Sequence, residues 1–544
     1  MPRIVFKILF TLFISAVVAC GGGGGSSSNS TVAPPAPADP VANPVVISGA
    51  ITFDRVPQRV SGTGLDYNNI ITDAARGVTV ELVNNAGVVQ STTATDNFGD
   101  YQLQAPGNTN VRLQVKAQMV STNAAAWNVR VADNTDGNAL YVIQGSLTNS
   151  GELDSTRNLH AASGWNTATG GYTEPRSAAP LAILDVIYEA MQLFAAIDPT
   201  VNFPPLELRW STANTTADGN LTDGDIGTSF YSAGAIYLVG GADNDTDEYD
   251  RHIIAHEWGH YVEDKLSRSD SIGGSHRSGD RLDMRVSFSE GFGYALAAIV
   301  LEDPIVRDSF GFGQSSGFSF DVEKNQTFNP GWYSEASVQS ILYDLADDES
   351  DGVDQIATGL AAIYDVMTSN AYRNSSALAT LYLFVSEFNR QYPEHTDNVN
   401  ALLNGQAVFG IDQWGTDESN NAGQETVLPV YAMGNLAARQ TVCTISEFNS
   451  VLQSSVNKLG NSVFVRYPNI TSGGYVINVE RISGSVNTEP QLSLYRNGAY
   501  ILDISNNPNG GIAWSGSLNA GDYVLVLSQA DATPGCYSLS FSNN

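Results

Sequence analysis

The spacing of apolar residues changes twice along the 544-residue chain, and this change constrains the fold more than any other feature. From about 46 to 145, segments such as VTVEL (78–82) alternate apolar and polar side chains, which indicates half-buried strands. From about 155 to 435 apolar residues recur every three or four positions, as in LAILDVIYEAMQLFAAI (181–197), which indicates amphipathic helices. From about 443 the alternation returns in SVFVRY, YVINVE and GDYVLVLS. The sequence therefore predicts a multidomain protein in which a mainly helical α+β domain is flanked by two all-β sandwiches.

The N-terminus carries the features of an export signal. Arg3 and Lys7 precede the apolar run ILFTLFISAVVA, which is too short for a stable membrane-spanning helix. The run ends in VVAC, which resembles the lipobox of bacterial lipoproteins. The resemblance implies a lipoprotein signal peptide over 1–19 and a lipid anchor on Cys20 in the cell envelope, with Gly21 typical of outer-membrane proteins. An ordinary signal peptide with a cysteine at its cleavage site is the alternative.

A segment rich in Gly, Ser and Pro follows the predicted lipidation site. Residues 20–45 combine a Gly/Ser run, which predicts a flexible tether, with a Pro-rich end, which predicts an extended spacer. We expect a linker there that holds the folded part away from the membrane.

The net charge of the chain limits the classes of partner that we expect it to bind. The sequence has 26 Lys and Arg against 57 Asp and Glu, which gives a net charge of −31. An acidic surface repels phosphate backbones and anionic lipid heads, so we expect neither a nucleic-acid partner nor a polybasic membrane contact. Of the remaining cysteines, Cys443 and Cys536 predict a disulfide in an oxidising compartment, with two free buried thiols as the alternative.

One segment, YDRHIIAHEWGHYVED (249–264), contains three of the six histidines in the chain. On a helix, His256 and His260 lie on one face one turn apart, so both imidazoles can bind one ion. Glu257 beside them can reach a metal-bound water without being a ligand, which is the H-E-x-x-H arrangement of zinc hydrolases. His252 lies about 12 Å along the axis from His260, so we expect it to pack rather than bind. The segment predicts a catalytic zinc site.

A hydrolytic zinc site needs a third protein ligand and one open position. The metzincin pattern is excluded, because Glu263 and Leu266 occupy the places of its glycine and third histidine. The segment SFSEGFGYALAA offers Glu290, near a candidate N-cap at Ser289, in a predicted helix that can approach closely through Gly291 and Gly293. His276 and Asp283 are rival third ligands.

The run GAIYLVGGADNDTDEYDRHIIAHEWGHYVED, with SEGFGYA after it, is similar to gluzincin metallopeptidases, the thermolysin and fungalysin group. The resemblance implies a zincin-like metallopeptidase domain in which His256, His260 and Glu290 bind Zn²⁺ and Glu257 is the general base acting on a zinc-activated water. It also implies a protein or peptide substrate, and we expect a monomer. Tyr294 stands where thermolysin-like enzymes place an Asp, so the groups that orient the ligands must come from elsewhere. Asp250, Asp283 or a backbone carbonyl are the candidates.

The flanking regions also resemble known modules. TATDNFGDYQLQAPG is similar to carboxypeptidase-regulatory-like β-sandwiches, and LNAGDYVLVLS is similar to pre-peptidase C-terminal domains. The expected organisation is a signal peptide (1–19), a linker (20–45), a β-sandwich (46–150), a zinc metallopeptidase domain (155–435) and a C-terminal β-sandwich (440–544).

Further roles are expected at positions outside the zinc ligands. Tyr333, in a turn-rich loop before a helix, is our candidate for stabilising the oxyanion, and Tyr343, His276 and His395 are the other candidates. By analogy with gluzincins, strand AIYLV (235–239) is expected to pair with the substrate backbone, with an ordinary internal strand as the alternative.

Two acidic runs, DNDTDEYD (243–250) and DDESDGVD (347–354), could bind Ca²⁺. Neither matches the EF-hand loop, so a solvated surface is expected for both.

A catalytically silent surface adhesion or binding lipoprotein on a peptidase scaffold is the alternative function, although its decayed site would have no reason to retain Glu257. A zinc hydrolase that acts on a non-peptide amide is a third hypothesis for the function.

Overall fold

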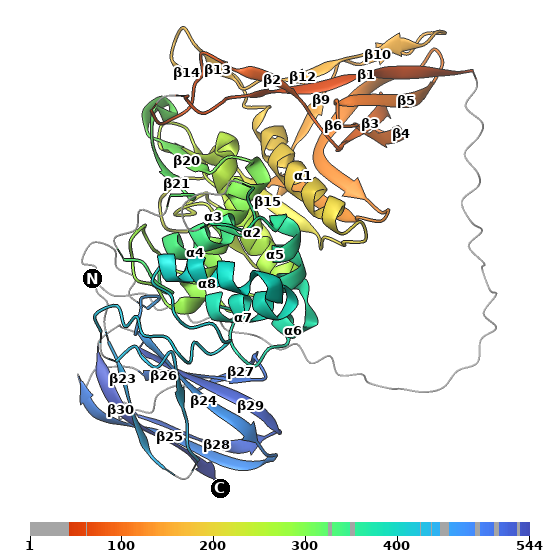
Figure 1. The fold of residues 1–544 in the computed structure, drawn as a ribbon. Coiled ribbons are helices and arrows are strands. Elements are labelled where there is room, and N and C mark those ends of the chain that lie inside the picture. Colours follow the sequence, from red (N-terminus) through yellow and green to blue (C-terminus); the bar gives the residue numbers. More distant parts are fainter. Residues whose placement is uncertain are drawn as a thin grey trace, which may run out of the picture. The chain divides into compact units, whose positions relative to one another are not determined.

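The computed structural model describes residues 43–544 apart from 61, 325–328, 349–353, 425, 437, 446–455, 485–489, 505–510 and 530–533. The expected signal peptide, the lipidation site Cys20 and the linker up to residue 42 lie outside the described residues. The described part contains several β-sheets and eight α-helices (Figure 1). It is built around more than one apolar core, as expected for a multidomain chain.

Two sheets form the N-terminal region. Alternating burial in β1, β5 and β6 places every second side chain in the core, as the sequence predicts. The first sheet contains β1 (Pro44–Arg55), β2 (Ile71–Ala74), β5 (Asp100–Pro106), β11 (Ser155–Thr156) and β12 (Leu159–Ala161). The second contains β3 (Val78–Asn84), β4 (Val89–Ala94), β6 (Asn110–Ser121), β7 (Trp127–Asp133), β8 (Ala139–Leu140), β9 (Val142–Gln144), β10 (Thr148–Asn149), β15 (Leu206–Trp210), β16 (Phe230–Ser232) and β17 (Ala235–Leu238).

The second sheet crosses the expected boundary between the first sandwich and the metallopeptidase domain. Its strand order is β16-β17-β15-β7-β6-β3-β4, and β15 pairs parallel with β7, with Leu208 opposite Val131. Pairing with β15 satisfies the edge of β7 that an isolated sandwich would leave open. Residues 46–150 and 155–435 therefore share a sheet, and the expected boundary does not separate two structures.

Strand β17 corresponds to the AIYLV segment that was expected to pair with substrate. Its Ile236 lies opposite Leu208 of β15 on one side and opposite Tyr231 of β16 on the other. Both edges of the strand are therefore occupied by the protein itself. The expectation of substrate pairing at β17 is wrong, because the three residues of β16 cover the free edge that the sequence does not reveal.

The helices pack against one another and against strands of the second sheet. The helix α1 contributes Phe194, whose ring packs edge-on against Trp258 of α2 at 4.9 Å. Helices α1 and α3 are long and apolar enough to cross a membrane, but most of their residues are buried within the fold, as in core helices. The helices are α1 (Ala179–Ile197), α2 (Arg251–Leu266), α3 (Met284–Leu301), α4 (Glu335–Asp344), α5 (Gly359–Thr368), α6 (Asn370–Arg373), α7 (Leu381–Gln391) and α8 (Thr396–Gly405), with short 3₁₀ turns η1 (Asp247–Tyr249), η2 (Phe312–Gln314) and η3 (Pro393–His395).

Small sheets surround the helices. A hairpin of β13 (Trp165–Asn166) and β14 (Gly171–Tyr172) precedes α1. A four-stranded sheet in the order β18-β19-β20-β21 joins the segment before α2 to the segment after α3. Its strands are β18 (Gly240–Gly241), β19 (Asp245–Thr246), β20 (Ile305–Phe310) and β21 (Ser316–Asp321).

The C-terminal strands form two sheets around their own apolar core, which includes Val465, Leu494, Leu525 and Phe541. One sheet contains β22 (Tyr431–Met433), β24 (Ser462–Ile470), β26 (Pro490–Arg496), β27 (Ala499–Ile504) and β29 (Gly521–Gln529). The other contains β23 (Gln440–Thr444), β25 (Gly473–Gly484), β28 (Ile512–Leu518) and β30 (Gly535–Asn543). This is the two-layer arrangement expected for the C-terminal region.

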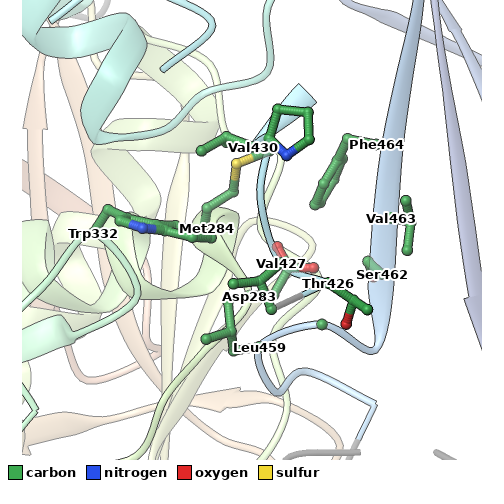
Figure 2. A pocket seen from close by; sticks show the side chains of 12 residues that line it. Asp283, Met284, Trp332, Thr426, Val427, Val430, Leu459, Ser462, Val463 and Phe464 are labelled. Carbon is green, nitrogen blue, oxygen red and sulfur yellow. The ribbon is translucent and has the colours of Figure 1, made fainter. Parts of the chain in front are cut away.

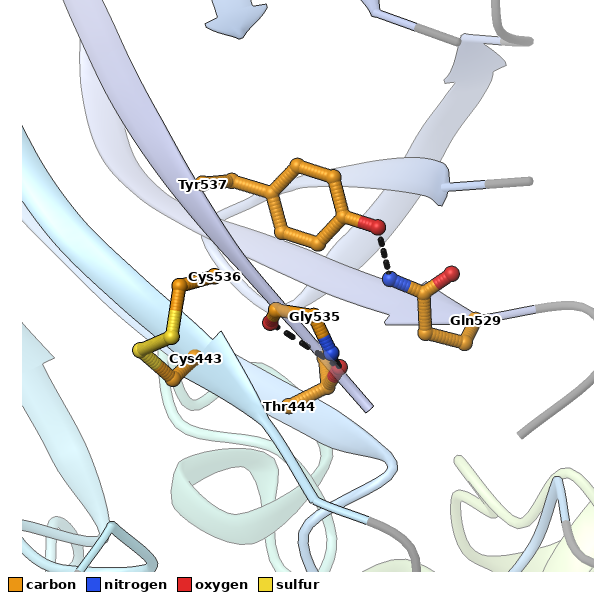
Figure 3. The surroundings of a disulfide bond; sticks show 6 residues. All are labelled: Cys443, Thr444, Gln529, Gly535, Cys536 and Tyr537. Atoms are coloured by element: carbon orange, nitrogen blue, oxygen red, sulfur yellow. Dashed lines mark hydrogen bonds between the residues drawn. A yellow bond between two sulfur atoms is a disulfide. The ribbon is translucent and has the colours of Figure 1, made fainter. Parts of the chain in front are cut away.

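The expected disulfide joins Cys443 of β23 to Cys536 of β30 (Figure 3). The two cysteines lie directly opposite each other in an antiparallel pair. Beside them, the Thr444 hydroxyl exchanges hydrogen bonds with the backbone of Gly535, and Gln529 donates to the Tyr537 hydroxyl. The disulfide therefore links β23, the first strand of this sheet in chain order, to β30, the last.

The C-terminal region contacts the start of α3. Asp283 N donates to Asn457 O at 2.8 Å, and Leu459 N donates to Arg281 O at 2.9 Å. A pocket beside these bonds is lined by apolar side chains from both regions, including Met284, Val430 and Phe464 (Figure 2). These contacts fix the point at which α3 begins.

We predict that replacing both Cys443 and Cys536 by Ser destabilises the C-terminal sandwich by about 2–4 kcal/mol, because the disulfide closes a long loop in the unfolded chain. The cysteines are separated by 93 positions in the sequence. The measurement is the thermal unfolding of the double variant against the oxidised parent. An unchanged Tm would show that the sheet holds these strands without the covalent link.

Candidate metal centre

Helix α2 places His256 and His260 on one face. Their Nε2 atoms lie 3.1 Å apart, and the two rings are perpendicular. His256 is 5 % exposed, so its ring is almost entirely withdrawn from solvent. The four-residue spacing thus brings two imidazole nitrogens to one point without backbone distortion.

Glu290 of α3 completes a triangle of donors. Its Oε2 lies 3.3 Å from His256 Nε2 and 3.5 Å from His260 Nε2. Donors held 2.0–2.1 Å from a tetrahedral zinc ion lie about 3.3 Å from one another. The three separations therefore fit one zinc ion, and the donor set of two imidazoles and a carboxylate is one that zinc accepts.

The donors of the triangle perturb one another's pKa values. Burial alone raises the pKa of Glu290, but His260 and His276 lower it by more, so the pKa of this carboxyl lies well below its ordinary value. Burial lowers the pKa of His260, but Glu290 and Glu263 outweigh burial and raise it well above the ordinary value. A buried negative carboxylate between imidazoles is an environment that favours a cation.

Two glycines allow α2 and α3 to approach each other. A Cβ at Gly293 would lie 2.7 Å from Nδ1 of His256, and a Cβ at Gly259 would lie 3.0 Å from the Cα of Gly293. The contact at Gly293 is shorter than a Cβ tolerates, and that at Gly259 is a tight one, so the close crossing depends chiefly on the missing methyl group of Gly293. Gly291, which the sequence also suggested for this contact, faces α4 instead, where a Cβ would lie 2.5 Å from that of Val338.

The groups that orient His260 differ from the expected ones. The Ser289 hydroxyl lies 3.1 Å from Nδ1 of His260 and also donates to the Glu263 carboxylate, whose Oε2 lies 3.4 Å from the same nitrogen. Ser289 was expected to cap its helix, but α3 begins five residues earlier, at Met284. Ser289 and Glu263 therefore form the outer support of His260.

Asp250 and Asp283, the expected supporting carboxylates, have other partners. Asp283 caps α3 by accepting from Arg285 N and pairs with the Arg285 guanidinium at 2.8 Å. Asp250 accepts from Ser309 N and Oγ and from the Gln58 amide. Neither contacts a ligand histidine, and Asp283 cannot be the third ligand because its carboxylate is committed to Arg285.

The ring of Tyr294 packs against His256, with 4.1 Å between centroids. Nδ1 of His256 is buried and accepts or donates no hydrogen bond among the described residues. Tyr294 therefore contacts the imidazole through its ring, which is tilted by 48° against that of His256. His252, which was expected to pack, is buried with its Nε2 3.0 Å from the Asp303 carbonyl oxygen, and burial lowers its pKa to about 4.

Glu257 lies on α2 next to the first ligand and is 7 % exposed. Among the described residues, no ion pair or hydrogen bond holds its carboxylate. Its negative charge adds to the groups that raise the pKa of His260. Glu257 therefore lies beside a ligand histidine without a fixed partner among the described residues.

The loop between α2 and α3 brings His276 to the edge of the centre. Its Nε2 lies 3.4 Å from Glu290 Oε2 and 3.3 Å from Glu335 Oε2. His276 does not belong to the group formed by His256, His260 and Glu290, whose donor atoms all lie within 4.8 Å of one another. It contacts Glu290 from outside that group. Burial raises the pKa of Glu335 to about 7, with His276 opposing this shift.

Sequence reasoning missed Glu335. It is the first residue of α4, and its only sequence signal is its place after the N-cap Ser334, which is common to many helices. Tyr333, the expected oxyanion donor, is buried, and its hydroxyl lies 3.1 Å from Pro330 O and 3.2 Å from Asn420 Oδ1, either of which can accept its single proton. The Tyr333 hydroxyl is thus engaged with neighbouring groups, while His276 lies at the edge of the centre. The oxyanion role of Tyr333 stays a prediction.

Comparisons with known proteins place the chain in no family. No protein-family model matches it, and no curated protein matches it. Solved structures that resemble part of it include the pre-peptidase C-terminal domain of a collagenase from Bacillus anthracis, at 16% identity over 20% of this chain and 93% of that chain, with a TM-score of 0.16. The surface-associated copper-binding protein CorA of Methylomicrobium album matches at 11% identity over 21% of this chain and 98% of that chain, with a TM-score of 0.17. At these scores the matches carry no argument about the metal centre.

We predict that Gly293→Ala displaces the His256 ring and weakens zinc binding at least about tenfold, with a loss of about 1–3 kcal/mol in stability from overpacking. The measurement is a zinc competition titration together with thermal unfolding. Gly171→Ala is the matched control, because a Cβ there meets open space. Equal zinc affinity in both variants would contradict the close crossing of α2 and α3.

Proposed function

We propose that this chain is an exported, membrane-tethered zinc metallopeptidase that hydrolyses protein or peptide substrates. The observation that carries the proposal is the triangle of His256, His260 and Glu290 with the Glu257 carboxylate beside it. Three protein ligands leave one position of a tetrahedral ion open, which separates catalytic from structural zinc sites. Zinc bound there would act as a Lewis acid and lower the pKa of its water.

Glu257 is the proposed general base. Its carboxylate can accept the proton of the attacking water and then deliver it to the departing amine nitrogen. Both tasks require a carboxylate that is withdrawn from bulk solvent and free of fixed partners, and Glu257 meets both conditions among the described residues. The histidines, by contrast, are held in place by Ser289 and Tyr294.

His276 is the proposed donor to the oxyanion. Its Nε2 lies within 3.4 Å of Glu290 and Glu335, so its ring is aimed at the centre from outside the ligand triangle. The Gly274 carbonyl oxygen lies 3.2 Å from Nδ1 and fixes the ring orientation. A donor held in this way can meet the charge that develops on a carbonyl oxygen.

The place of action follows from the N-terminal sequence. A lipid on Cys20 and the linker over 20–45 would tether the enzyme, as a monomer, to the outer membrane of a bacterial cell. The acidic surface disfavours nucleic acid as a partner. The substrate is a protein or peptide reached from the periplasm or the cell surface.

We predict that the full chain contains close to one zinc per molecule and that Glu290→Ala lowers this content at least about tenfold, because the third donor is lost. Elemental analysis of both proteins by plasma emission measures the metal. Retention of zinc in Glu290→Ala would show that another residue is the third ligand. No zinc in the wild type, even after zinc is added back, would favour the silent binding lipoprotein.

Glu257→Gln is expected to keep zinc and to lower the rate of casein hydrolysis about 100-fold or more, because the amide has no proton-accepting oxygen of comparable basicity. Glu394→Gln serves as the matched control, since Glu394 is exposed on η3. Casein hydrolysis by Glu257→Gln at the wild-type rate would remove Glu257 from the mechanism. Zinc-loaded wild type without activity on any amide would overturn the enzyme proposal itself.

A further inference from the structure

A second group of carboxylates converges outside the histidine centre. Asp245 lies on β19, Asp247 begins η1, and Asp308 lies on β20. One oxygen from each lies within 4.8 Å of the others. The group thus joins the segment just before α2 to the strand that follows α3, although these segments are about 60 positions apart in the sequence.

Asp247 is withdrawn from water, and Asp245 and Asp308 are half-buried, whereas Asp243 in the same acidic run is exposed. The solvated surface expected for 243–250 therefore holds only for the first part of the run. Asp247 is 3 % exposed, and its Oδ1 has no hydrogen-bond partner among the described residues. The Oδ1 atoms of Asp245 and Asp308 are also buried and unpartnered there. Only the second oxygen of Asp247 is satisfied by a side chain, the Ser229 hydroxyl. Buried polar atoms without partners are rare and require an explanation.

No cationic side chain in the described part of the chain balances this charge. None forms an ion pair with Asp245, Asp247 or Asp308, and the nearby Arg176 is committed to Glu248. Asp250 adds a further buried carboxylate beside them. Burial and Glu248 raise the pKa of Asp245 to about 6, and burial and Asp245 raise that of Asp308 to about 7. Buried charges persist at neutral pH only when they are paired or coordinate a metal.

We propose that Asp245, Asp247 and Asp308 bind a calcium ion. The donors are all oxygen, which selects hard cations over zinc. Ca²⁺ takes six to eight oxygens at about 2.3–2.6 Å, so ligands on opposite sides of the ion lie up to about 5 Å apart, and the observed convergence fits within that span. The unpartnered Oδ1 atom of Asp247 is the observation that separates this group from an ordinary acidic cluster.

The position of the proposed calcium site between β19, η1 and β20 indicates a structural role for the ion. The calcium site holds the chain just before α2, which carries His256 and His260, against β20. The partner strand β21 carries Phe320, whose ring packs on Tyr294 at 5.0 Å, and Tyr294 packs on His256. Calcium binding therefore stabilises the framework around the histidine centre. This inference does not depend on the peptidase activity.

The test is a calcium titration of the full chain in buffer freed of divalent ions by chelating resin, with zinc restored to one equivalent. We expect one Ca²⁺ per chain with a Kd below about 1 mM and an increase in Tm of several degrees at saturation. Asp308→Asn removes one charge at constant size. It should weaken calcium binding at least about tenfold and abolish the increase in Tm, while zinc content stays unchanged.

The controls separate this site from its surroundings. Asp348→Asn, an exposed position in the second acidic run, should bind calcium as the wild type does. Asp245→Asn provides a second variant in case Asp308→Asn does not fold. Absence of stoichiometric calcium binding in the wild type, or binding that survives both substitutions, would overturn the proposal. A protein that binds calcium but has no zinc would overturn the proposed function and leave the calcium site standing.

Discussion

The close crossing of α2 and α3 is the constraint on which the candidate centre depends. Gly259 and Gly293 remove the methyl groups that would keep the two helices apart, and the His256 ring occupies the space next to Gly293. Only at this separation do Nε2 of two residues on one helix and Oε2 of a residue on the other reach the spacing of a tetrahedral ion. A larger distance would separate Glu290 from both histidines of α2 and leave His276 as its neighbour.

Burial of negative charge recurs in the fold. Glu290 and Glu335 are buried beside imidazoles, which can carry the compensating positive charge or yield it to a metal. Asp245, Asp247 and Asp308 have no such neighbours among the described residues, and this difference is the reason for assigning them a bound cation. Imidazoles lie beside the carboxylates at the first site, whereas the second offers oxygen donors alone and would need a bound cation to balance their charge.

The C-terminal region contacts the loop that carries His276, next to the candidate metal centre. Lys458, which is 4 % exposed, donates to the Ser275 carbonyl oxygen at 2.8 Å and pairs with Asp280 at 3.0 Å. Both partners belong to the loop that carries His276. Asn457 and Leu459 also bond to the backbone at the start of α3. The sandwich that the sequence suggests as a separate module is therefore tied by hydrogen bonds to the loop beside the metal ligands.

The sequence by itself determined the local features of this protein. Periodicity predicted the strands, the helices and the all-β C-terminal region, because side-chain alternation and helical spacing are properties of neighbouring residues. The spacing of His256 and His260 also defined a shared helical face, and SEGFGYA pointed to Glu290. The sheet that joins β7 to β15, the strand covering β17, the support from Ser289 and Glu263, and the convergence of Asp245 with Asp308 were decided only by tertiary structure. Each of these brings together residues far apart in the chain, and no local pattern encodes which distant groups meet.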